Sequence, residues 1–278
     1  MSIRTDLAIE EIGEEKGIKT LNKTKGEVQI NEVEISDEKT AEKLNKKAGK
    51  YITVEFPSLE KITDYEDIKN GIKESLHSLL KEKDDNILVV GLGNNEITAD
   101  SIGPATTVKL LATRHIAGEF AEKIGLHGLK SVSVITPNVL GKTGIEVTET
   151  VAGLVEKIKP QAVIVIDALA SRSINRLFRT VQLSDSGISP GSGVKNSRKE
   201  LSLKTLGVPV IAVGVPTVMD AGNLAFELTG KETVSDTDMI VTPKDADLLC
   251  HRISEILAEA LNVFLQPEIE EEILLKLV

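Results

Sequence analysis

The stretch "NILVVGLGNNEITADSIGP" (residues 86–104) joins an apolar run to a glycine-rich turn that contains one aspartate, Asp100. An apolar run of this kind is typical of a strand that is buried on both faces of a sheet. A glycine turn after such a strand is a common site for phosphate groups in α/β proteins. The function depends on whether this turn binds a phosphate or presents its acid.

Similar apolar runs recur along the chain and alternate with helical patterns. The runs are "YITVEF" (51–56), "SVSVITP" (131–137), "AVIVIDAL" (162–169) and "VPVIAVGV" (208–215), and the helical patterns cover 65–83, 101–117, 145–159 and 243–265. Because buried strands need helices above and below them, we predict an α/β fold with a largely parallel central sheet and helices on both faces. The alternation in 27–35, "EVQINEVEI", indicates an exposed or edge hairpin.

Two segments depart from this alternation. Residues 170–207 include "SDSGISPGSGVKNSRKE", which is rich in Ser, Gly and basic residues, so we expect an irregular loop or small subdomain there. The tail 267–278, "PEIEEEILLKLV", is amphipathic and predicts a helix that docks on the body or on a neighbouring subunit. We expect both segments to be parts of one domain together with the strands and helices above.

Composition excludes several classes of protein. The net charge is −10 and no basic stripe is present, which argues against electrostatic binding of nucleic acid. The single cysteine, Cys250, excludes an intrachain disulfide and a cysteine-based zinc site. The sequence has no signal-peptide core and no apolar window long enough for a membrane span. We therefore expect a cytoplasmic protein.

Two motifs resemble nucleotide-binding loops, and both are defective. A dinucleotide fingerprint needs glycine at its first, third and sixth positions, and here Gly91 and Gly93 are followed by Glu96, which would repel a pyrophosphate. The stretch "TPNVLGKTG" (136–144) resembles a phosphate loop but has Thr136 in place of its first glycine. A small ligand such as a methyl donor on the first turn remains an alternative.

Two acids lie near strand ends, where functional groups gather in open α/β sheets. Asp100 follows the strand at 86–91, and Asp167 ends the run "AVIVI". If the two meet, repulsion and burial raise the pKa of one, and the pair can activate water and polarise a carbonyl. The alternatives are that Asp100 caps a helix and that Asp167 ends a strand or bonds a ribose. Asn94 either caps the turn or orients an acid.

A metal is the other use for paired acids. Zinc catalysis generally needs a histidine, and none of the four histidines follows a strand end (His77, His115, His127 and His251). A Mg²⁺ site built from aspartates alone remains open.

Five motifs in order resemble the germination protease family of spore-forming bacteria, the endopeptidases that degrade small acid-soluble spore proteins. They are "IRTDLAIE" (3–10), "GLGNNEITADSIGP" (91–104), "TPNVLGKTGIEVTE" (136–149), "VIVIDALASRS" (163–173) and "SDSGISPGSGVKNSRKELS" (184–202). The resemblance runs from Ile3 to beyond residue 220. It implies an atypical aspartic peptidase whose catalytic acids are Asp100 and Asp167.

The resemblance also implies a fold similar to that of the hydrogenase maturation endopeptidases, which bind a metal through two acids and a histidine. Since no histidine is suitably placed here, we expect no catalytic metal and no cofactor. The roles of Lys142 and Thr143 stay unassigned. The basic residues of the irregular segment are candidates to meet acids beside the cleaved bond (Lys195, Arg198 and Lys199).

The family is made as a zymogen that cuts itself. The layout of "TDLAIE" matches its cleavage segments, which implies scission between Asp6 and Leu7 and a propeptide of residues 1–6. The resemblance further implies spore proteins as substrates, a homotetramer in the spore core, and no direct contact with nucleic acid or membrane. The rivals are a metal-dependent maturation endopeptidase on the same fold and a nucleotide- or ligand-binding regulatory module.

Overall fold

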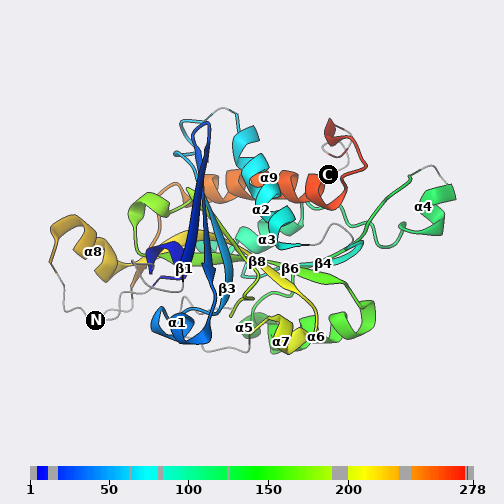
Figure 1. Ribbon diagram of the computed structural model, residues 1–278, viewed down its shortest axis with the longest axis horizontal. Coiled ribbons are helices and arrows are strands. Elements are labelled where there is room, and N and C mark those ends of the chain that lie inside the picture. The colour runs from blue at the N-terminus through cyan, green and yellow to red at the C-terminus, as the bar shows by residue number, and fades with distance from the viewer. Residues whose placement is uncertain are drawn as a thin grey trace.

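The computed structural model describes residues 5–11, 18–62, 64–80, 84–123, 126–189, 200–231, 239–272 and 274. Its strands form one nine-stranded sheet, drawn edge-on in Figure 1. They are β1 (Ile18–Lys25), β2 (Val28–Ile35), β3 (Gly49–Glu55), β4 (Asn86–Gly91), β5 (Ser131–Ile135), β6 (Ala162–Ser171), β7 (Thr180–Ser184), β8 (Val210–Asp220) and β9 (Ile240–Val241).

The sheet has a parallel half and an antiparallel half. Its order is β1-β2-β3-β7-β8-β6-β4-β5, and β9 pairs with β8. The strands β5, β4, β6 and β8 run parallel, whereas β1, β2, β3 and β7 pair antiparallel with their neighbours. The parallel arrangement therefore covers half of the sheet, less than the largely parallel sheet expected from the apolar runs.

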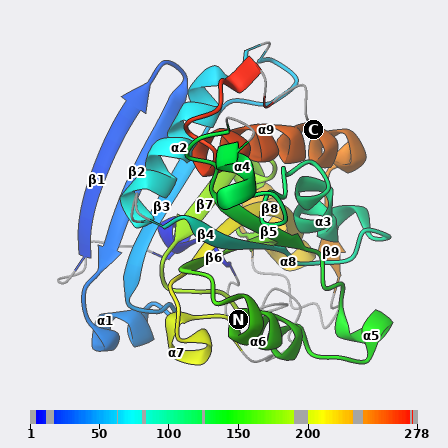
Figure 2. The same ribbon diagram turned by 90° about the vertical axis from the view of Figure 1, so that its right-hand side faces the viewer.

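The helices lie on both faces of this sheet, as the α/β prediction requires, and Figures 1 and 2 show the two layers. They are α1 (Glu38–Lys43), α2 (Glu66–Leu79), α3 (Ile102–Thr107), α4 (Glu119–Lys123), α5 (Leu140–Thr143), α6 (Val147–Ile158), α7 (Leu203–Leu206), α8 (Ala221–Thr229) and α9 (Ala246–Leu265). The described residues also form three short 3-10 helices: η1 (Ala8–Glu10), η2 (Thr98–Asp100) and η3 (Ile174–Arg176).

Alternation along β6 divides the core between the two faces. Ile164 and Ile166 pack with α2 and α9 on one face, while Val163 and Val165 pack with α6 on the other. Successive side chains of a strand point to opposite faces, so a strand with helices on both sides must be apolar throughout. Asp167 continues this alternation and therefore points to the α6 face.

Two segments differ from the sequence-based expectation. The segment 170–207 contains the regular strand β7, which pairs antiparallel with β3 and β8; its residues 190–199 lie outside the described part. The helix expected over 101–117 ends at Thr107, where Thr107 Oγ1 bonds back to the carbonyl of Gly103 at 3.0 Å. A run of Thr106, Thr107 and Val108 has low helix propensity, which fits this early end.

The ends of the chain add two observations. The hairpin expected at 27–35 is formed by β1 and β2 and leads into β3. Residues 271, 272 and 274 have helical conformation, but most of the remaining tail lies outside the described residues. In the described part of the chain, every helix is too short or too polar to cross a membrane.

Candidate active site

The turn from Leu92 to Gly103, here called the acid turn, is fixed to the sheet by its backbone. The Leu92 N–H donates to the carbonyl of Ile166 on β6 at 2.8 Å. The Asn94 N–H donates to both the carbonyl of Asp100 (3.1 Å) and its carboxylate Oδ2 (2.9 Å). The turn is thus closed on itself around Asp100, whose side chain is half-buried.

Glycine is required where the turn approaches the strands. A Cβ on Gly103 would lie against the backbone of Leu92 and 2.7 Å from the carbonyl oxygen of Ile166. Gly93 has a φ of +109° and leaves no room for a side chain beside the Asp100 carbonyl. The glycines of this stretch therefore let α3 and the acid turn lie directly on the ends of β4 and β6.

Two side chains hold η2, the part of the turn that carries Asp100. Thr217 Oγ1 of β8 donates to the carbonyl of Ala99 at 2.6 Å. Cys250 Sγ of α9 donates to the carbonyl of Thr98 at 3.1 Å. Burial raises the pKa of the Cys250 thiol to about 11, so it stays protonated and serves as a donor. The lone cysteine therefore has a structural role.

Asp100 does not cap α3. The residue at the N-cap position is Ser101, and the Asp100 carboxylate instead accepts the Asn94 N–H. Asn94 Oδ1 accepts the Glu96 N–H at 3.0 Å, so Asn94 both closes the turn and contacts the acid. The cap alternative for Asp100 is thereby wrong.

Asp167 lies within β6, because this strand continues to Ser171. Its side chain is 7% exposed, and its Oδ1 accepts the N–H of Ala168 at 2.9 Å. Gly214 on β8 pairs with both Asp167 and Gln182 of β7, which places these two side chains on the same face of the sheet. They belong to strands two positions apart, about 10 Å between axes.

Asp100 and Asp167 come to the same edge of the sheet. The helix η2, which ends at Asp100, contacts both β6 and β8. The acid turn begins beside Ile166, the residue before Asp167. Sheet order, with β6 between β4 and β8, is what brings these acids together from positions far apart in sequence.

The N-terminal segment, residues 5–11, also lies at this strand end. The strand β6 extends past Ile166, the last residue that pairs with β4. The Asp6 N–H donates to the Ala170 carbonyl at 2.9 Å, and the Ala170 N–H donates to Asp6 Oδ2 at 2.8 Å. The segment is thus attached to the free edge of β6 by one backbone hydrogen bond and by the Asp6 carboxylate.

Gln182 bridges the two backbone groups that flank Leu7, the Asp6 carbonyl and the Ala8 N–H. Its Nε2 donates to the Asp6 carbonyl at 3.2 Å, and its Oε1 accepts the Ala8 N–H at 2.6 Å. The Leu7 N–H donates to Thr5 Oγ1 at 3.0 Å, and the Leu7 side chain is 0% exposed. Since Gln182 and Asp167 share a face of the sheet, the peptide bond between Asp6 and Leu7 lies on the Asp167 side.

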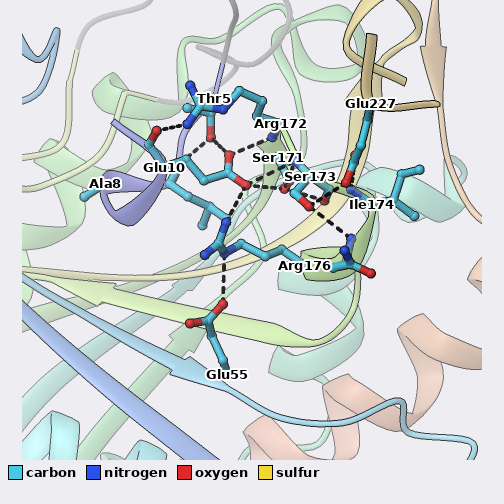
Figure 3. A network of polar contacts seen from close by, with 12 residues as sticks. Thr5, Ala8, Glu10, Glu55, Ser171, Arg172, Ser173, Ile174, Arg176 and Glu227 are labelled. Carbon is cyan, nitrogen blue, oxygen red and sulfur yellow. Dashed lines mark hydrogen bonds and ion pairs between the residues drawn. The ribbon is translucent and has the colours of Figure 1, made fainter. Parts of the chain in front are cut away.

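Glu10 is the most heavily bonded acid of the segment, as Figure 3 shows. Its carboxylate accepts hydrogen bonds from Thr5, Ser171, the backbone N–H groups of Arg172 and Ser173, and Arg176. Burial acts to raise the pKa of Glu10, but the bonds from Thr5, Arg172 and Ser171 and the charge of Arg176 lower it overall. Glu10 is therefore bound as a carboxylate.

Lys46 contacts the segment from the loop after α1. Its Nζ donates to the Thr5 carbonyl at 2.8 Å. Burial lowers the pKa of Lys46, although the charges of Asp6, Glu11 and Glu10 act in the opposite direction. The segment is therefore held by the Lys46 side chain on one side and by residues of β6 and β7 on the other.

The two nucleotide-like motifs contact each other. Lys142 of α5 forms an ion pair with Glu96 of the acid turn, and both side chains are exposed. Thr143 Oγ1 accepts the Ile145 N–H at 3.1 Å, so it closes its own turn. Lys195, Arg198 and Lys199 lie outside the described residues.

Metal ligands and cavities among the described residues are two further indicators of a site. Within the described ranges, no three His, Cys, Asp or Glu side chains are grouped closely enough to hold a metal ion. His127 pairs with Glu122, and His251 pairs with Glu255. A cavity of about 510 Å³ lies at the amino end of β4, where Asp85 and Ile87 are among its lining residues, opposite the end that carries the acid turn.

The sequence points to two candidate acids and a candidate cleavage segment, but it does not point to the groups that contact this segment. Gln182 gives no signal in sequence, because its role comes from pairing of β7 with β8. Arg172 and Arg176 do give one, since two arginines directly follow the strand that carries Asp167. The sequence prediction instead names the basic residues at 195–199, which lie outside the described part of the chain.

Comparisons with known proteins agree with the order of motifs. A model of the Peptidase_A25 family, described as germination protease, matches residues 3–229. A germination protease of Clostridium tetani (strain Massachusetts / E88) is 40% identical over 98% of each chain. A germination protease of Caldanaerobacter subterraneus subsp. tengcongensis is 38% identical over 98% of this chain and 97% of its own chain. A germination protease of Oceanobacillus iheyensis is 43% identical over 79% of this chain and 64% of its own chain.

One solved structure is also similar. It is a [NiFe] hydrogenase maturation protease, HycI, from Thermococcus kodakarensis KOD1, with a TM-score of 0.39 and 14% identity over 68% of this chain and 97% of that chain.

Proposed function

The chain belongs to the germination protease family, and from this premise we propose that it is an endopeptidase that first cuts its own chain between Asp6 and Leu7. A protease role in spore germination follows from membership of the family. The finer parts of the proposal are an aspartate pair as the catalytic groups, a zymogen whose propeptide ends at Asp6, and small acid-soluble spore proteins as later substrates.

One observation carries the proposal. The N-terminal segment lies on the free end of β6, the strand that also carries Asp167, and Gln182 bridges the backbone groups that flank Leu7. A flexible charged terminus has no reason to bury Leu7 completely or to place both Asp6 and Glu10 on specific donors. The segment is bound as a substrate is bound.

The chemistry requires one base and one acid around a water molecule. An ionised carboxylate of the pair takes a proton from water, and the resulting hydroxide attacks the Asp6 carbonyl carbon. The second carboxyl group, protonated, polarises the carbonyl and gives its proton to the leaving nitrogen of Leu7. The carbon–nitrogen bond breaks and leaves a carboxylate on Asp6 and an ammonium group on Leu7.

Gln182 supports this step by its position. Its Nε2–H already donates to the Asp6 carbonyl oxygen, where negative charge develops during the attack. Its Oε1 fixes the Ala8 N–H and so prevents the chain after the cleaved bond from turning. Gln182 thus orients the carbonyl toward the face that carries Asp167.

Zymogen control suits the proposed place of action. A protease that removes DNA-coating spore proteins must stay inactive in the spore core until germination, and self-cleavage delays its activity. We expect a homotetramer, with the irregular segment and the tail 267–278 as parts of a single peptidase domain. A change of internal pH that protonates one member of the aspartate pair would start the processing.

The experiment is self-cleavage of the purified full-length chain at mildly acid pH, followed by sequencing of the new N-terminus. Leu7 is expected as the first residue for the wild type, with the rate reduced at least about 1,000-fold for Asp100→Asn and for Asp167→Asn. A chelator is expected to leave the rate unchanged.

The matched control is Asp85→Asn, which changes an exposed acid at the amino end of β4. Normal processing by either Asp100→Asn or Asp167→Asn would show that the site is wrongly assigned. A rate that is flat between pH 5 and pH 8 would contradict the pH trigger.

A further inference from the structure

The Glu10 carboxylate occupies a defined pocket, here called the acid pocket, made by Ser171, Arg172, Ser173 and Arg176. The distances to Glu10 Oε1 are 3.0 Å from Ser171 Oγ, 3.1 Å from the Ser173 N–H and 3.2 Å from Arg176 Nη1. The Arg172 N–H reaches Oε2 at 2.7 Å, and Arg172 Nη2 donates to the backbone carbonyl of Glu10. The Glu10 side chain is 1% exposed.

The walls of the acid pocket are supported by residues outside the N-terminal segment. Arg176 Nε donates to Glu55 of β3 at 2.9 Å, and Asn31 of β2 donates to the same carboxylate at 2.8 Å. Ser173 Oγ donates to Glu227 of α8 at 2.9 Å, and Figure 3 shows Glu55 and Glu227 beside Arg176 and Ser173. The pocket therefore keeps its shape when Glu10 leaves it.

The donors of the acid pocket select a carboxylate over an amide. Two backbone N–H groups, one hydroxyl and one guanidinium point at the two oxygens of Glu10. A glutamine in the same place would turn its NH₂ group toward donors, and at least one buried donor would lose its partner. A site built on hydrogen bonds rejects such an analogue strongly.

Cleavage of the chain provides a reason for Glu10 to leave. Hydrolysis of the Asp6–Leu7 bond creates an ammonium group at Leu7, in a place where the side chain is fully buried and the nitrogen contacts Thr5 Oγ1. Two residues depart with the propeptide: Thr5, which donates a hydrogen bond to the Glu10 carboxylate, and Asp6, which bonds to Ala170. The cut segment thus has fewer contacts with the protein than the uncut one, and Glu10 is free to leave the acid pocket.

We propose that the acid pocket is a substrate subsite, which binds an acidic side chain four residues beyond the cleaved bond. Its own Glu10 fills this subsite before self-cleavage, as the acid four residues after Asp6, and a peptide substrate with the same spacing of acids fills it afterwards. Arg176 and the N–H groups of Arg172 and Ser173 determine the specificity. This inference rests on the proposed function for the position of the cleaved bond.

The test measures peptide binding without cleavage. The host is the full chain with Asp100→Asn to prevent hydrolysis, Leu7→Asp to expel the segment and Glu10→Ala to empty the pocket. Fluorescein-labelled Thr-Asp-Leu-Ala-Ile-Glu is titrated with the host and followed by fluorescence anisotropy, beside the same peptide ending in Gln. The Glu peptide is expected to bind at least about 10-fold more tightly than the Gln peptide.

Variants of the host assign this preference to the pocket. Arg176→Gln is expected to reduce the ratio of affinities to within about 2-fold, while Arg179→Gln, which changes an exposed arginine nearby, leaves it unchanged. The chain with Asp100→Asn alone, whose own Glu10 fills the pocket, is expected to bind the Glu peptide at least about 10-fold more weakly than the host. Circular dichroism is used to check that each variant is folded. If the host with Leu7→Asp is unfolded, a second host carries Asp100→Asn, Asp6→Ala and Glu10→Ala instead.

Equal affinity for the two peptides, an unchanged ratio in Arg176→Gln, or no binding to either folded host would overturn the subsite. Failure of the proposed function looks different, because wild-type chain would then retain its N-terminus while the host still preferred the Glu peptide. Conversely, self-cleavage at Leu7 with no preference for the Glu peptide would remove the subsite and leave the protease activity standing.

Discussion

The acid turn and the N-terminal segment meet the same end of β6, and different contacts hold them there. The acid turn is fixed by backbone hydrogen bonds and by glycines that leave no space between it and the strands. The segment is fixed mainly by side chains, above all Gln182 and the acid pocket around Glu10. The backbone contacts of the acid turn are a permanent part of the fold. The side-chain contacts of the segment, such as those with the Glu10 carboxylate, can be replaced by the same contacts with another peptide.

The largest expected effect comes from a substitution in the permanent part. Gly103→Ala places a Cβ against the backbone of Leu92 and Ile166, neither of which can move without breaking the sheet edge. We expect a loss of about 3 kcal/mol or more in the free energy of unfolding, measured by urea denaturation.

Gly153→Ala is the matched control for this substitution. Gly153 is an exposed residue of α6 with no other atom within 4 Å of the added Cβ. Because glycine inside a helix is unfavourable, this change is expected to stabilise the protein by about 0.5–1 kcal/mol. If both glycines tolerate alanine equally, the acid turn is not held as tightly as described.

A smaller effect is expected for Gln182, which contacts the N-terminal segment from the Asp167 face of the sheet. The quantity that changes is the rate of self-cleavage and not the free energy of unfolding. Gln182→Ala removes the donor to the Asp6 carbonyl and the acceptor of the Ala8 N–H, so self-cleavage should slow about 100-fold. Mass spectrometry of the N-terminus over time gives the rate.

Gln161→Ala serves as the control for Gln182→Ala. Gln161 uses its carboxamide at the opposite end of β4, where it accepts the N–H groups of Asp85 and Asn86. Its substitution should leave the cleavage rate within about 2-fold of the wild type. Equal slowing by both variants would mean that Gln182 acts only through stability.

The smallest effect is expected in the exchangeable contacts and depends on pH. The pKa of Glu10 is lowered in the folded protein, because hydrogen bonds and Arg176 outweigh the effect of burial. Its contribution to stability is therefore fully present above the ordinary value of 4.5 and is lost as the pH falls below it. In an Asp100→Asn background, Glu10→Gln should cost about 1–2 kcal/mol at pH 7.

The pH profile of that difference is the measurement. Urea unfolding of the two chains should show the gap narrow as the pH falls below 4.5, whereas Glu60→Gln, at an exposed position, shows no gap at pH 7 or in acid. A gap that grows as the pH falls would mean that the pocket holds Glu10 as the neutral acid and not as a carboxylate.

Much of the fold was visible in the sequence for a simple reason. Continuous apolar runs such as 162–169 occur where a strand is covered on both faces, and each such run is a strand in the structure. The strand β7 was missed because "TVQLS" is short, lies in a polar stretch and depends on partners far away in the chain. Early termination of α3 at Thr107 reflects contacts of side chains that a helical pattern does not show.

The candidate site was predictable in part. Asp100 and Asp167 follow apolar runs, so their place at one sheet edge could be expected from sequence. The binding of the N-terminal segment could not, because Asp6, Ala170 and Gln182 are brought together by pairing across more than 160 positions. Residues of this kind carry no local pattern, and only the order of strands in the sheet places them.

The overhang of β6 beyond Ile166 has a consequence for the life of the protein after it is cut. The amide and carbonyl of Ala170 are satisfied by Asp6 while the chain is intact. Once the first residues depart, the N–H and carbonyl of Ala170 lose these partners. An extended segment of another polypeptide, including a second copy of the protein, is then able to pair with this exposed strand edge. The intact N-terminal segment therefore covers the free edge of β6. We expect cut protein stored without substrate to aggregate sooner than uncut protein.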